Sequence, residues 1–281
     1  MDDAQILAGY LTAVPRVSTG DRPELRRGQF HDVVLAGDAA YRFPRDELTR
    51  RALPGRVALL RVLGKCQLPA ATPVPLAHAG MYEPLGRCHI ALTRLRGEPL
   101  PRELAARSEP AVIAGLGGLL EALRGLGGQP AVGDAVPEAD PRHWERFAAE
   151  VARVLFPLMS RPGRLRAEAE LARVAAVDPA GTALVHGDLG GTNLLWTVTE
   201  SGPRLAGVLD WDEAHLGSQA EDLASLAVTF GWPLAERLDG SRRALPDARA
   251  IAATFALQQA LPAALVGDQV MLADGLATYV D

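Results

Sequence analysis

Lysine is almost absent from this sequence. Of its 29 lysine and arginine residues, Lys65 is the only lysine and all the others are arginines. A site that holds phosphate groups with a basic side chain would therefore have to use arginine, unless Lys65 serves. Cysteine is also scarce, because Cys66 and Cys88 are the only two and have no paired spacing. This excludes a disulfide-based fold and predicts buried, reduced thiols.

Long uncharged stretches are missing as well. No run approaches the roughly 18 apolar residues of a membrane-spanning helix, so we expect neither a transmembrane segment nor a membrane partner. The acidic start, Met1-Asp2-Asp3, lacks the basic region of a signal peptide, and we expect a cytoplasmic protein. The net charge of -5 argues against a nucleic-acid partner and favours a cationic one. No obligate protein partner is inferred.

What the sequence does contain is a group of polar residues between short apolar runs. These runs are residues 182–185, 193–198 and 205–209. A turn signal at 200–203 joins the second run to the third, which predicts an antiparallel hairpin. Asn193 enters its first strand and Asp210 leaves its second, so strands about 5 Å apart would place the two side by side. Asp188 lies on the loop that leads into the same end.

Two carboxylates and an amide oxygen suit a hard divalent cation together with a base. The spacing His-x-Asp-x-x-x-x-Asn, followed by an Asp-aromatic-x triplet, matches the catalytic and metal loops of protein kinases. In that template Asp188 accepts the proton of the attacking hydroxyl, and Asn193 and Asp210 hold Mg²⁺. ATP is the expected nucleotide, with GTP as the alternative. The competing interpretation is that Asp, Asn and Gly are turn formers around a hairpin.

Gly187 stands where protein kinases have arginine, and this His-Gly-Asp form resembles the aminoglycoside phosphotransferase and choline kinase group of small-molecule kinases. The resemblance implies an α+β, bilobal, protein-kinase-like fold. A small β-rich N-lobe would span residues 1–93, and a larger, mainly helical C-lobe would span residues 94–281. His186 is expected to be structural. Asp222, at a position where the family has Asp, is expected to be structural too and able to cap its own helix.

In such a fold the N-lobe would hold the nucleotide. Residues 26–35 predict two strands around a glycine-bearing turn, whose Gly28, Gln29, Phe30 and His31 would cover the phosphates. A third strand follows at 41–43. Arg42 takes the place of the template's lysine, and we interpret it as a phosphate ligand, the alternative being an exposed strand arginine. The helix expected at 57–63 lacks the template's glutamate. The usual Lys-Glu pair is therefore either absent or built from Asp46 or Glu47.

The link between the lobes is expected near residue 93. Prolines at 69, 73 and 75 predict an irregular crossing, and the apolar run from Cys88 to Leu92 predicts a strand. The adenine edge would bond backbone groups near Thr93 and Leu95, with Leu92 lining its face. An edge strand followed by a simple linker is the alternative. Beyond residue 100 the apolar spacing becomes helical, and helices are expected at 111–126, 144–158, 165–177, 221–230, 248–264 and 270–279.

Further stretches resemble a narrower group, the phosphotransferases that inactivate the cyclic peptide antibiotics capreomycin and viomycin. The stretches are Gly28–Val34, Leu53–Arg56, Phe156–Ser160, Val185–Asn193, Asp210–Glu213 and Thr254–Leu261. This resemblance implies ATP-dependent phosphorylation of a seryl hydroxyl on a strongly basic peptide, with capreomycin as the first expectation. The added phosphate would weaken drug binding to ribosomal RNA. An aminoglycoside or other small-alcohol kinase is one alternative, and a nucleotide-binding pseudoenzyme lacking the usual Lys and Glu is another.

A polycationic substrate would need fixed anions near the reacting hydroxyl. In such kinases the residues after the metal loop and the terminal helices wall the acceptor site. Glu213, Glu221, Asp268 and Asp274 are the acids in those places, and we expect them to contact the substrate. The alternative for each is a solvated position on a helix face.

Overall fold

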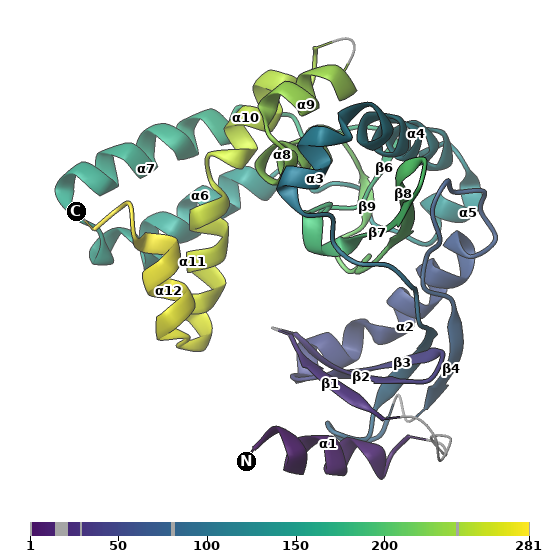
Figure 1. Ribbon diagram of the computed structural model, residues 1–281. Helices are drawn as coiled ribbons and strands as arrows, with labels where there is room; N and C mark the ends of the chain where they lie inside the picture. The colour runs from purple at the N-terminus through teal and green to yellow at the C-terminus, as the bar shows by residue number, and fades with distance from the viewer. Residues whose placement is uncertain (1, 15–21, 29, 80–81, 240–241, 281) are drawn as a thin grey trace. The chain divides into compact units, whose positions relative to one another are not determined.

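The computed structural model of the protein describes residues 2–14, 22–28, 30–79, 82–239 and 242–280 (Figure 1). The chain divides into two compact units. Unit 1 consists of Met1–Ala122, Gln129–Val136 and Thr192–Asp212, and unit 2 consists of Leu123–Gly128, Pro137–Gly191 and Glu213–Asp281. The lobe boundary predicted at residue 93 coincides with the end of a strand and stays a prediction.

Unit 1 contains a five-stranded antiparallel sheet with the strand order β1-β2-β3-β5-β4. Its strands are β1 (Glu24–Arg27), β2 (His31–Ala36), β3 (Ala39–Pro44), β4 (Pro75–Ala79) and β5 (His89–Thr93). The three strands predicted before residue 44 are therefore present. Pro75 was expected in an irregular crossing but begins β4. Proline is compatible with the first residue of a strand at a sheet edge, and β4 is such a strand.

Two helices flank this sheet on opposite faces in Figure 1, α1 (Asp3–Leu11) and α2 (Glu47–Leu63). Strand alternation decides which side chains each face presents. Val34 and Phe43 belong to the face that carries Tyr10 of α1 in one apolar cluster. His31 on β2 and Arg42 on β3 are one residue out of phase with them, so they belong to the other face. The sheet thus separates the face that carries this apolar cluster from the face that presents His31 and Arg42.

The hairpin predicted between Asn193 and Asp210 is confirmed. It consists of β7 (Leu194–Thr199) and β8 (Gly202–Val208), paired antiparallel with Leu194 opposite Val208. Two chain segments bond to its strands. Ala71 donates to the Ala206 carbonyl at 3.0 Å, and Glu98 and Trp196 exchange backbone bonds of 3.0 and 2.8 Å. Unit 1 also includes the helices α3 (Arg102–Arg107) and α5 (Pro130–Gly133) and most of α4 (Glu109–Gly127).

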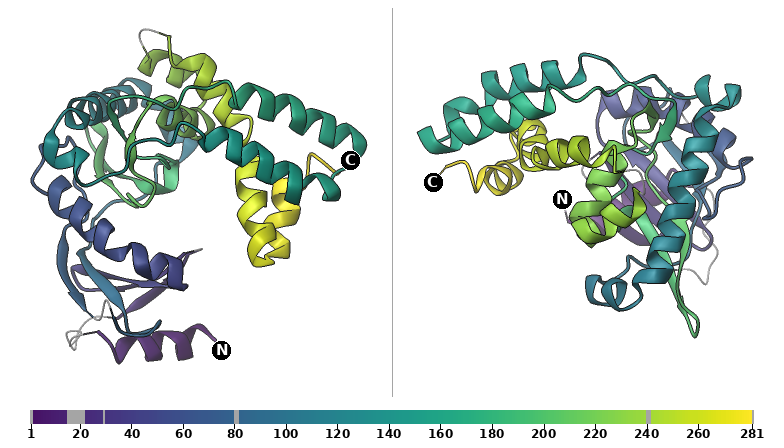
Figure 2. Two further views of the ribbon diagram at one scale, coloured as in Figure 1. Left: turned by 180° about the vertical axis from the view of Figure 1, so that it is seen from behind. Right: turned by 90° about the horizontal axis from the view of Figure 1, so that it is seen from above.

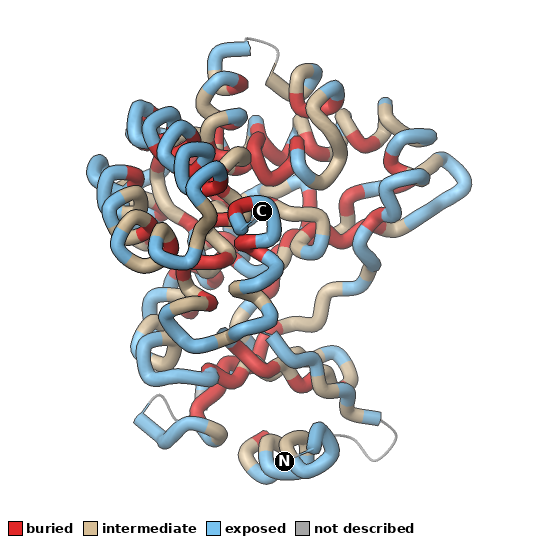
Figure 3. Tube along the Cα trace, turned by 90° about the vertical axis from the view of Figure 1, so that its left-hand side faces the viewer, coloured by how far each residue is buried: buried red, intermediate tan, exposed pale blue. Residues whose placement is uncertain are grey.

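Unit 2 is mainly helical around one pair of short strands, β6 (Ala183–Val185) and β9 (His215–Gly217). Its helices are α6 (His143–Val154), α7 (Arg161–Val174), α8 (Ala220–Phe230), α9 (Trp232–Leu238), α10 (Leu245–Ala252), α11 (Phe255–Val266) and α12 (Gln269–Leu276), and the short turn η1 (Phe156–Leu158) follows α6. Helices α11 and α12 lie side by side, as do α6 and α7 (Figure 2). Figure 3 shows that exposed and buried residues alternate along these helices, as expected of helices with one face toward a core.

One helical stretch among the described residues, Leu245–Val266, is long and apolar enough to cross a membrane, although the sequence predicted none. Length and composition alone are weak evidence for a membrane span, because a helix in the core of a soluble protein can have the same length and composition. The stretch consists of α10 and α11, so the helical region predicted at 248–264 is present but is interrupted between the two helices. The break lies at Thr254, which is buried and donates its hydroxyl hydrogen to the Ile251 carbonyl at 2.8 Å. The two helices pack on α8 and α12, respectively.

Candidate active site

Asn193 and Asp210 emerge together from the open end of the β7–β8 hairpin. The Leu209 N–H donates to the Asn193 carbonyl at 2.8 Å, which extends the ladder one step beyond Leu194 and Val208. Asp210 then takes a left-handed backbone conformation with φ 56°, which a short polar side chain tolerates better than most. Trp211 is buried, and its Nε1 donates to the Val208 carbonyl at 3.3 Å. The hairpin and this indole therefore fix the loop that carries Asp210.

Arg42 on β3 contacts both acids of the Asp-Trp-Asp triplet. Its Nη1 lies 3.2 Å from Asp212 Oδ1 and its Nη2 lies 3.1 Å from Asp212 Oδ2, so the two planar groups meet as a fork. Nη2 also lies 2.9 Å from Asp210 Oδ1. A lysine has one point charge and could not make this bidentate contact. Arg42 stands where kinases have lysine, and its contact with Asp212 depends on the two-pronged guanidinium group that only arginine has.

Of the two alternatives for the Lys-Glu pair, the one built from Asp46 or Glu47 is wrong. Asp46 caps α2, with its Oδ1 accepting from the Thr49 N–H at 2.7 Å. Glu47 pairs with Arg50 at 2.6 Å and with Arg51 at 3.2 Å along the same helix. Both acids serve the start of α2, and the acid opposite Arg42 is Asp212, on the loop that follows β8.

Burial and the charge of Arg42 together act on the pKa values of its neighbours. Burial opposes ionisation of Asp212, but Arg42, Arg56 and His31 hold the pKa of this carboxyl below its ordinary value. Burial, and then the charge of Arg42, lowers the pKa of His31 to about 4, so the imidazole is neutral near pH 7. Its Nδ1 lies 3.1 Å from Arg42 Nη2. A guanidinium only donates, so Nδ1 accepts and the ring proton is on Nε2.

The predicted glycine-bearing turn joins β1 to β2. The Gly28 N–H donates to the His31 carbonyl at 2.9 Å. A Cβ at Gly28 would lie 2.7 Å from that carbonyl oxygen, so the turn requires glycine. The Phe30 side chain is exposed, and Gln29 lies outside the described residues. The Arg45 Nη1 donates to the Gly28 carbonyl at 2.6 Å and supports the turn from the end of β3.

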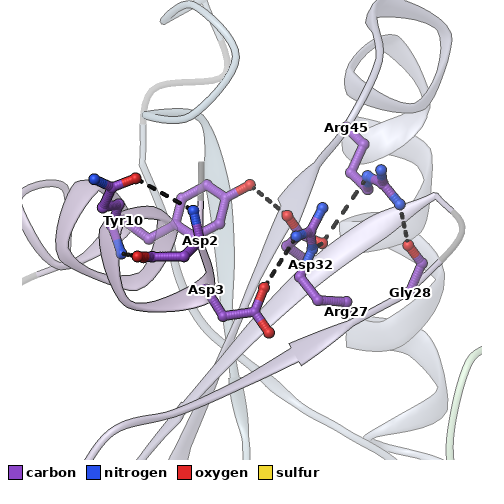
Figure 4. Close-up of polar contacts among 8 residues, drawn as sticks. Asp2, Asp3, Tyr10, Arg27, Gly28, Asp32 and Arg45 are labelled. Carbon is purple, nitrogen blue, oxygen red and sulfur yellow. Dashed lines mark hydrogen bonds and ion pairs between the residues drawn. The ribbon is translucent and has the colours of Figure 1, made fainter.

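A buried carboxylate braces the strands next to this turn (Figure 4). Asp32 accepts from the Tyr10 hydroxyl at 2.8 Å and from Arg27 Nε at 2.9 Å. The Arg45 Nε lies 4.0 Å from the same carboxylate. Burial and the bond to Asp32 raise the pKa of Tyr10 to about 12, so its hydroxyl stays a donor. Asp32 therefore ties α1 to the flank of the turn from the face opposite His31.

The proposed adenine contacts lie at the end of β5. Leu92 is buried. The Thr93 N–H donates to the Val74 carbonyl at 2.9 Å, and the Thr93 hydroxyl accepts from the Val74 N–H at 2.9 Å. An adenine contact at Thr93 cannot use this amide. Leu95 packs on Gly207 of β8, where a Cβ would lie 2.8 Å from Leu95 Cδ1. The roles of Leu92, Thr93 and Leu95 stay predictions.

In unit 2, Asp222 supports the loop that carries Asp188. This carboxylate is fully buried and accepts from the backbone N–H groups of His186 at 3.0 Å and Gly187 at 3.1 Å. It therefore binds the loop and does not cap α8. Burial raises the pKa of Asp222 to about 7, although the two N–H donors favour the carboxylate. His186 Nδ1 accepts from the Asp188 N–H at 3.2 Å, which adds a second support to the loop.

Gly187 explains one departure from the protein-kinase pattern. Its φ is +84°, and a Cβ there would lie 2.6 Å from the Glu213 carbonyl oxygen. The arginine of protein kinases would not fit in this backbone conformation. Asp188 follows directly, five residues before Asn193 in the sequence. Its convergence with Asn193 and Asp210 stays a prediction.

Replacing Asp222 with alanine tests the support of this loop. The change leaves one buried and one partly buried N–H group without the Asp222 acceptor, and each such loss costs about 1–3 kcal/mol when the group is buried. We expect the free energy of unfolding, measured by urea denaturation, to fall by roughly 2–5 kcal/mol. Glu168→Ala, which removes an exposed ion pair with Arg164 on α7, is the control and should change it by less than about 0.5 kcal/mol. An Asp222→Ala protein as stable as this control would contradict the supporting role.

The four acids expected to bind a cationic substrate all belong to unit 2 but differ in their surroundings. Glu213 and Asp274 are exposed, although Asp274 also accepts from Gln259 Nε2 at 2.7 Å. Glu221 Oε1 lies 3.5 Å from His215 Nε2, and this carboxylate raises the pKa of His215 to about 9 against the opposing effect of burial. Asp268 accepts from two N–H groups at the start of α12. Glu213 and Asp274 therefore remain the most accessible predicted contacts.

The residues predicted to hold Mg²⁺ fit a cation that takes few protein ligands. Within the described parts of the chain, no three His, Cys, Asp or Glu side chains are grouped to hold a metal ion. Mg²⁺ typically takes only one or two protein oxygens and completes its shell with water and phosphates. Asn193 and Asp210 supply oxygens of this kind. The Asp210 side chain is 45% exposed and can accept a further ligand, whereas that of Asp212 is 20% exposed.

Three comparisons show which known proteins this chain is similar to. The sequence model described as "Phosphotransferase enzyme family" matches residues 21–262. Viomycin phosphotransferase from Streptomyces vinaceus is 40% identical over 265 residues, which is 91% of each chain. The GDP and kanamycin complex of APH(2")-IIIa matches with a TM-score of 0.81 at 17% identity, over 98% of this chain and 97% of that one. A macrolide 2'-phosphotransferase type I matches with a TM-score of 0.72 at 20% identity, over 100% and 98%. These likenesses confirm the predicted fold class.

Proposed function

We propose that this chain, which belongs to the phosphotransferase enzyme family, transfers the γ-phosphate of ATP to a hydroxyl of a basic cyclic peptide antibiotic. The chain is an antibiotic-inactivating phosphotransferase, and the peptide acceptor is the proposal. The observation that carries it is the 40% identity to viomycin phosphotransferase over 91% of both chains. We name capreomycin first and viomycin second as substrates, with a seryl hydroxyl as the acceptor and the cytoplasm as the place of reaction.

Each residue of the proposed site would have its own role in phosphoryl transfer. Asp188 would accept the proton of the attacking hydroxyl, since a positioned carboxylate can act as general base. Arg42 would hold the nucleotide phosphates, and the turn of Gly28 to His31 would cover them. Asn193 and Asp210 would hold Mg²⁺, which when bound neutralises charge on the phosphates. Leu92, Thr93 and Leu95 would receive the adenine.

The peptide is a cation and the nucleotide is an anion. The salt dependence of their KM values can therefore distinguish how the enzyme binds each of them. The chain carries a net charge of -5, and Glu213 and Asp274 present exposed carboxylates in unit 2. A polycation held by such groups loses attraction as ions screen the charges, because the Debye length falls from about 10 Å at 0.1 M to about 3 Å at 1 M. We expect the KM for capreomycin or viomycin to rise steeply across a salt series, and the KM for ATP to change much less.

Steady-state kinetics over the salt series would measure both constants in one preparation. Glu213→Gln combined with Asp274→Asn should flatten the salt dependence of the peptide KM while leaving that of ATP unaltered. Parallel salt curves for peptide and ATP would contradict an anionic peptide site.

A further inference from the structure

Protein kinases position their phosphate-binding lysine with a glutamate from the helix that follows the strand, and activity depends on that pair. In this chain the corresponding helix is α2, and it presents Arg56 where the acid would be expected. An arginine there would repel Arg42 unless an anion lay between the two. Asp212 is that anion, because it is in contact with both guanidinium groups.

The distances define a chain of three charges within unit 1, which we call the Asp212 bridge: Arg42, Asp212 and Arg56. Arg42 meets both oxygens of Asp212, at 3.2 and 3.1 Å. Arg56 Nε lies 3.6 Å from Asp212 Oδ1. The side chains of Arg42, Asp212 and Arg56 are 15%, 20% and 27% exposed, so the bridge is largely shielded from solvent and from salt. Such enclosed, bidentate contacts hold geometry better than exposed ion pairs.

Arg42 Nη2 has more acceptors within reach than it has hydrogens to donate. Nη2 carries two hydrogens, yet it lies 3.1 Å from His31 Nδ1, 2.9 Å from Asp210 Oδ1 and 3.1 Å from Asp212 Oδ2. The three acceptors share two hydrogens. Arg42 can therefore give up the more exposed Asp210 and turn a hydrogen toward a nucleotide phosphate. Asp212 still holds Nη1 throughout.

We propose that Asp212 and Arg56 replace the strand-helix ion pair of kinases: Asp212 positions the fork of Arg42 for the nucleotide phosphates, and Arg56 ties Asp212 to α2. Asp212 and Arg56 are positioning residues, since both act through Arg42. This inference rests on the proposed function, in which Arg42 binds phosphates. It also explains why the chain uses arginine at position 42, since only a fork engages both carboxylate oxygens of Asp212 at once.

The test uses the full-length enzyme and compares the ATP KM, kcat, the apparent Mg²⁺ affinity and the thermal unfolding of each variant. Asp212→Asn is expected to raise the ATP KM at least about tenfold, with kcat and the Mg²⁺ requirement changed less, because a ground-state phosphate contact is lost. Glu47→Gln removes an acid from α2 that pairs only along the helix surface, and it should behave as wild type.

Arginine-to-lysine changes give a matched pair. Arg42→Lys loses the fork and should raise the ATP KM about as much as Asp212→Asn does, and it tests the same contact if Asp212→Asn fails to fold. Arg56→Lys keeps a single charge near one oxygen and should stay within about twofold of wild type, whereas Arg56→Gln should raise the ATP KM severalfold. The Arg42→Lys, Asp212→Asn double variant should be no worse than the poorer single variant, as expected for two residues in one contact.

Three results would overturn the proposal: an unchanged ATP KM in Asp212→Asn, additive effects in the double variant, or a loss of Mg²⁺ affinity in Asp212→Asn that matches its loss of ATP affinity. The last result would make Asp212 a metal ligand. Calorimetric titration of nucleotide in the absence of acceptor measures ATP and Mg²⁺ binding alone. It therefore tests the role of Asp212 independently of which substrate the enzyme phosphorylates. If the wild-type enzyme bound ATP but phosphorylated neither peptide, the substrate proposal would be wrong. The nucleotide-binding measurements on the variants would still test the Asp212 bridge.

Discussion

Asp188→Asn is expected to lower phosphoryl transfer by about 10²- to 10⁴-fold while nucleotide affinity stays nearly unchanged. The amide has the size of the carboxylate but cannot accept the hydroxyl proton. The backbone of the loop should be retained because two groups of hydrogen bonds support it. The Asp222 carboxylate accepts from the His186 and Gly187 N–H groups, and His186 Nδ1 accepts from the Asp188 N–H. Neither support involves the carboxylate that is replaced.

Single-turnover kinetics with capreomycin and calorimetry with ATP would separate the two effects. Asp178→Asn is a suitable control, because Asp178 lies in the same unit, is exposed and accepts only a local bond from the Ala180 N–H. Wild-type turnover in a purified, folded Asp188→Asn protein would show that another group takes the proton.

Asp210→Ala is expected to reduce Mg²⁺-dependent ATP binding by about two orders of magnitude or more, because one of very few protein oxygens for the cation is lost. The structure adds a second consequence. Arg42 loses its contact of 2.9 Å with Asp210 but keeps both contacts with Asp212. Binding of ATP in the absence of Mg²⁺, which depends on Arg42 and not on the metal, should therefore fall much less.

Titrations with and without Mg²⁺ would measure this difference directly. Asp38→Ala removes an almost fully exposed acid of the same unit and provides the control. If Asp210→Ala bound Mg-ATP as tightly as wild type, Asp210 would be only a turn residue with a left-handed backbone, and the metal assignment would fail.

The hairpin and the group of polar residues at its end could be predicted from sequence because local rules determine them. A turn signal between two apolar runs fixes the register, and the register brings Asn193 and Asp210 to one end without any tertiary contact. Gly28 is similarly local, since its turn closes on His31 three residues later.

The partner of Arg42 could not be predicted in the same way. Asp212 lies 170 residues from Arg42 in the sequence, and an acid beside the metal loop carries no local sign of a contact with β3. The kinase template places the acid on α2, where Asp46 and Glu47 are the acids near the start of the helix. A useful signal was present in Arg56, since a second arginine at the expected place of an acid required an anion from elsewhere.

Helix limits depended on features that periodicity does not report. The helix expected to begin at residue 57 begins at Glu47, because Asp46 caps it and Leu53 is buried on its inner face despite Pro54. The helical region predicted at 248–264 is interrupted at Thr254, whose hydroxyl and N–H both bond to the Ile251 carbonyl. In both cases a polar side chain bonds to the backbone at the boundary, whereas the apolar spacing continues across it.

The most direct test of the proposed function is a transfer assay with purified enzyme, ATP and Mg²⁺, offering capreomycin, viomycin and kanamycin separately and detecting phosphorylated product by mass spectrometry. We predict that capreomycin or viomycin gains one phosphate group, with the modification on a seryl hydroxyl, and that Asp188→Asn forms almost none. Efficient phosphorylation of kanamycin together with no reaction of either peptide would contradict the account.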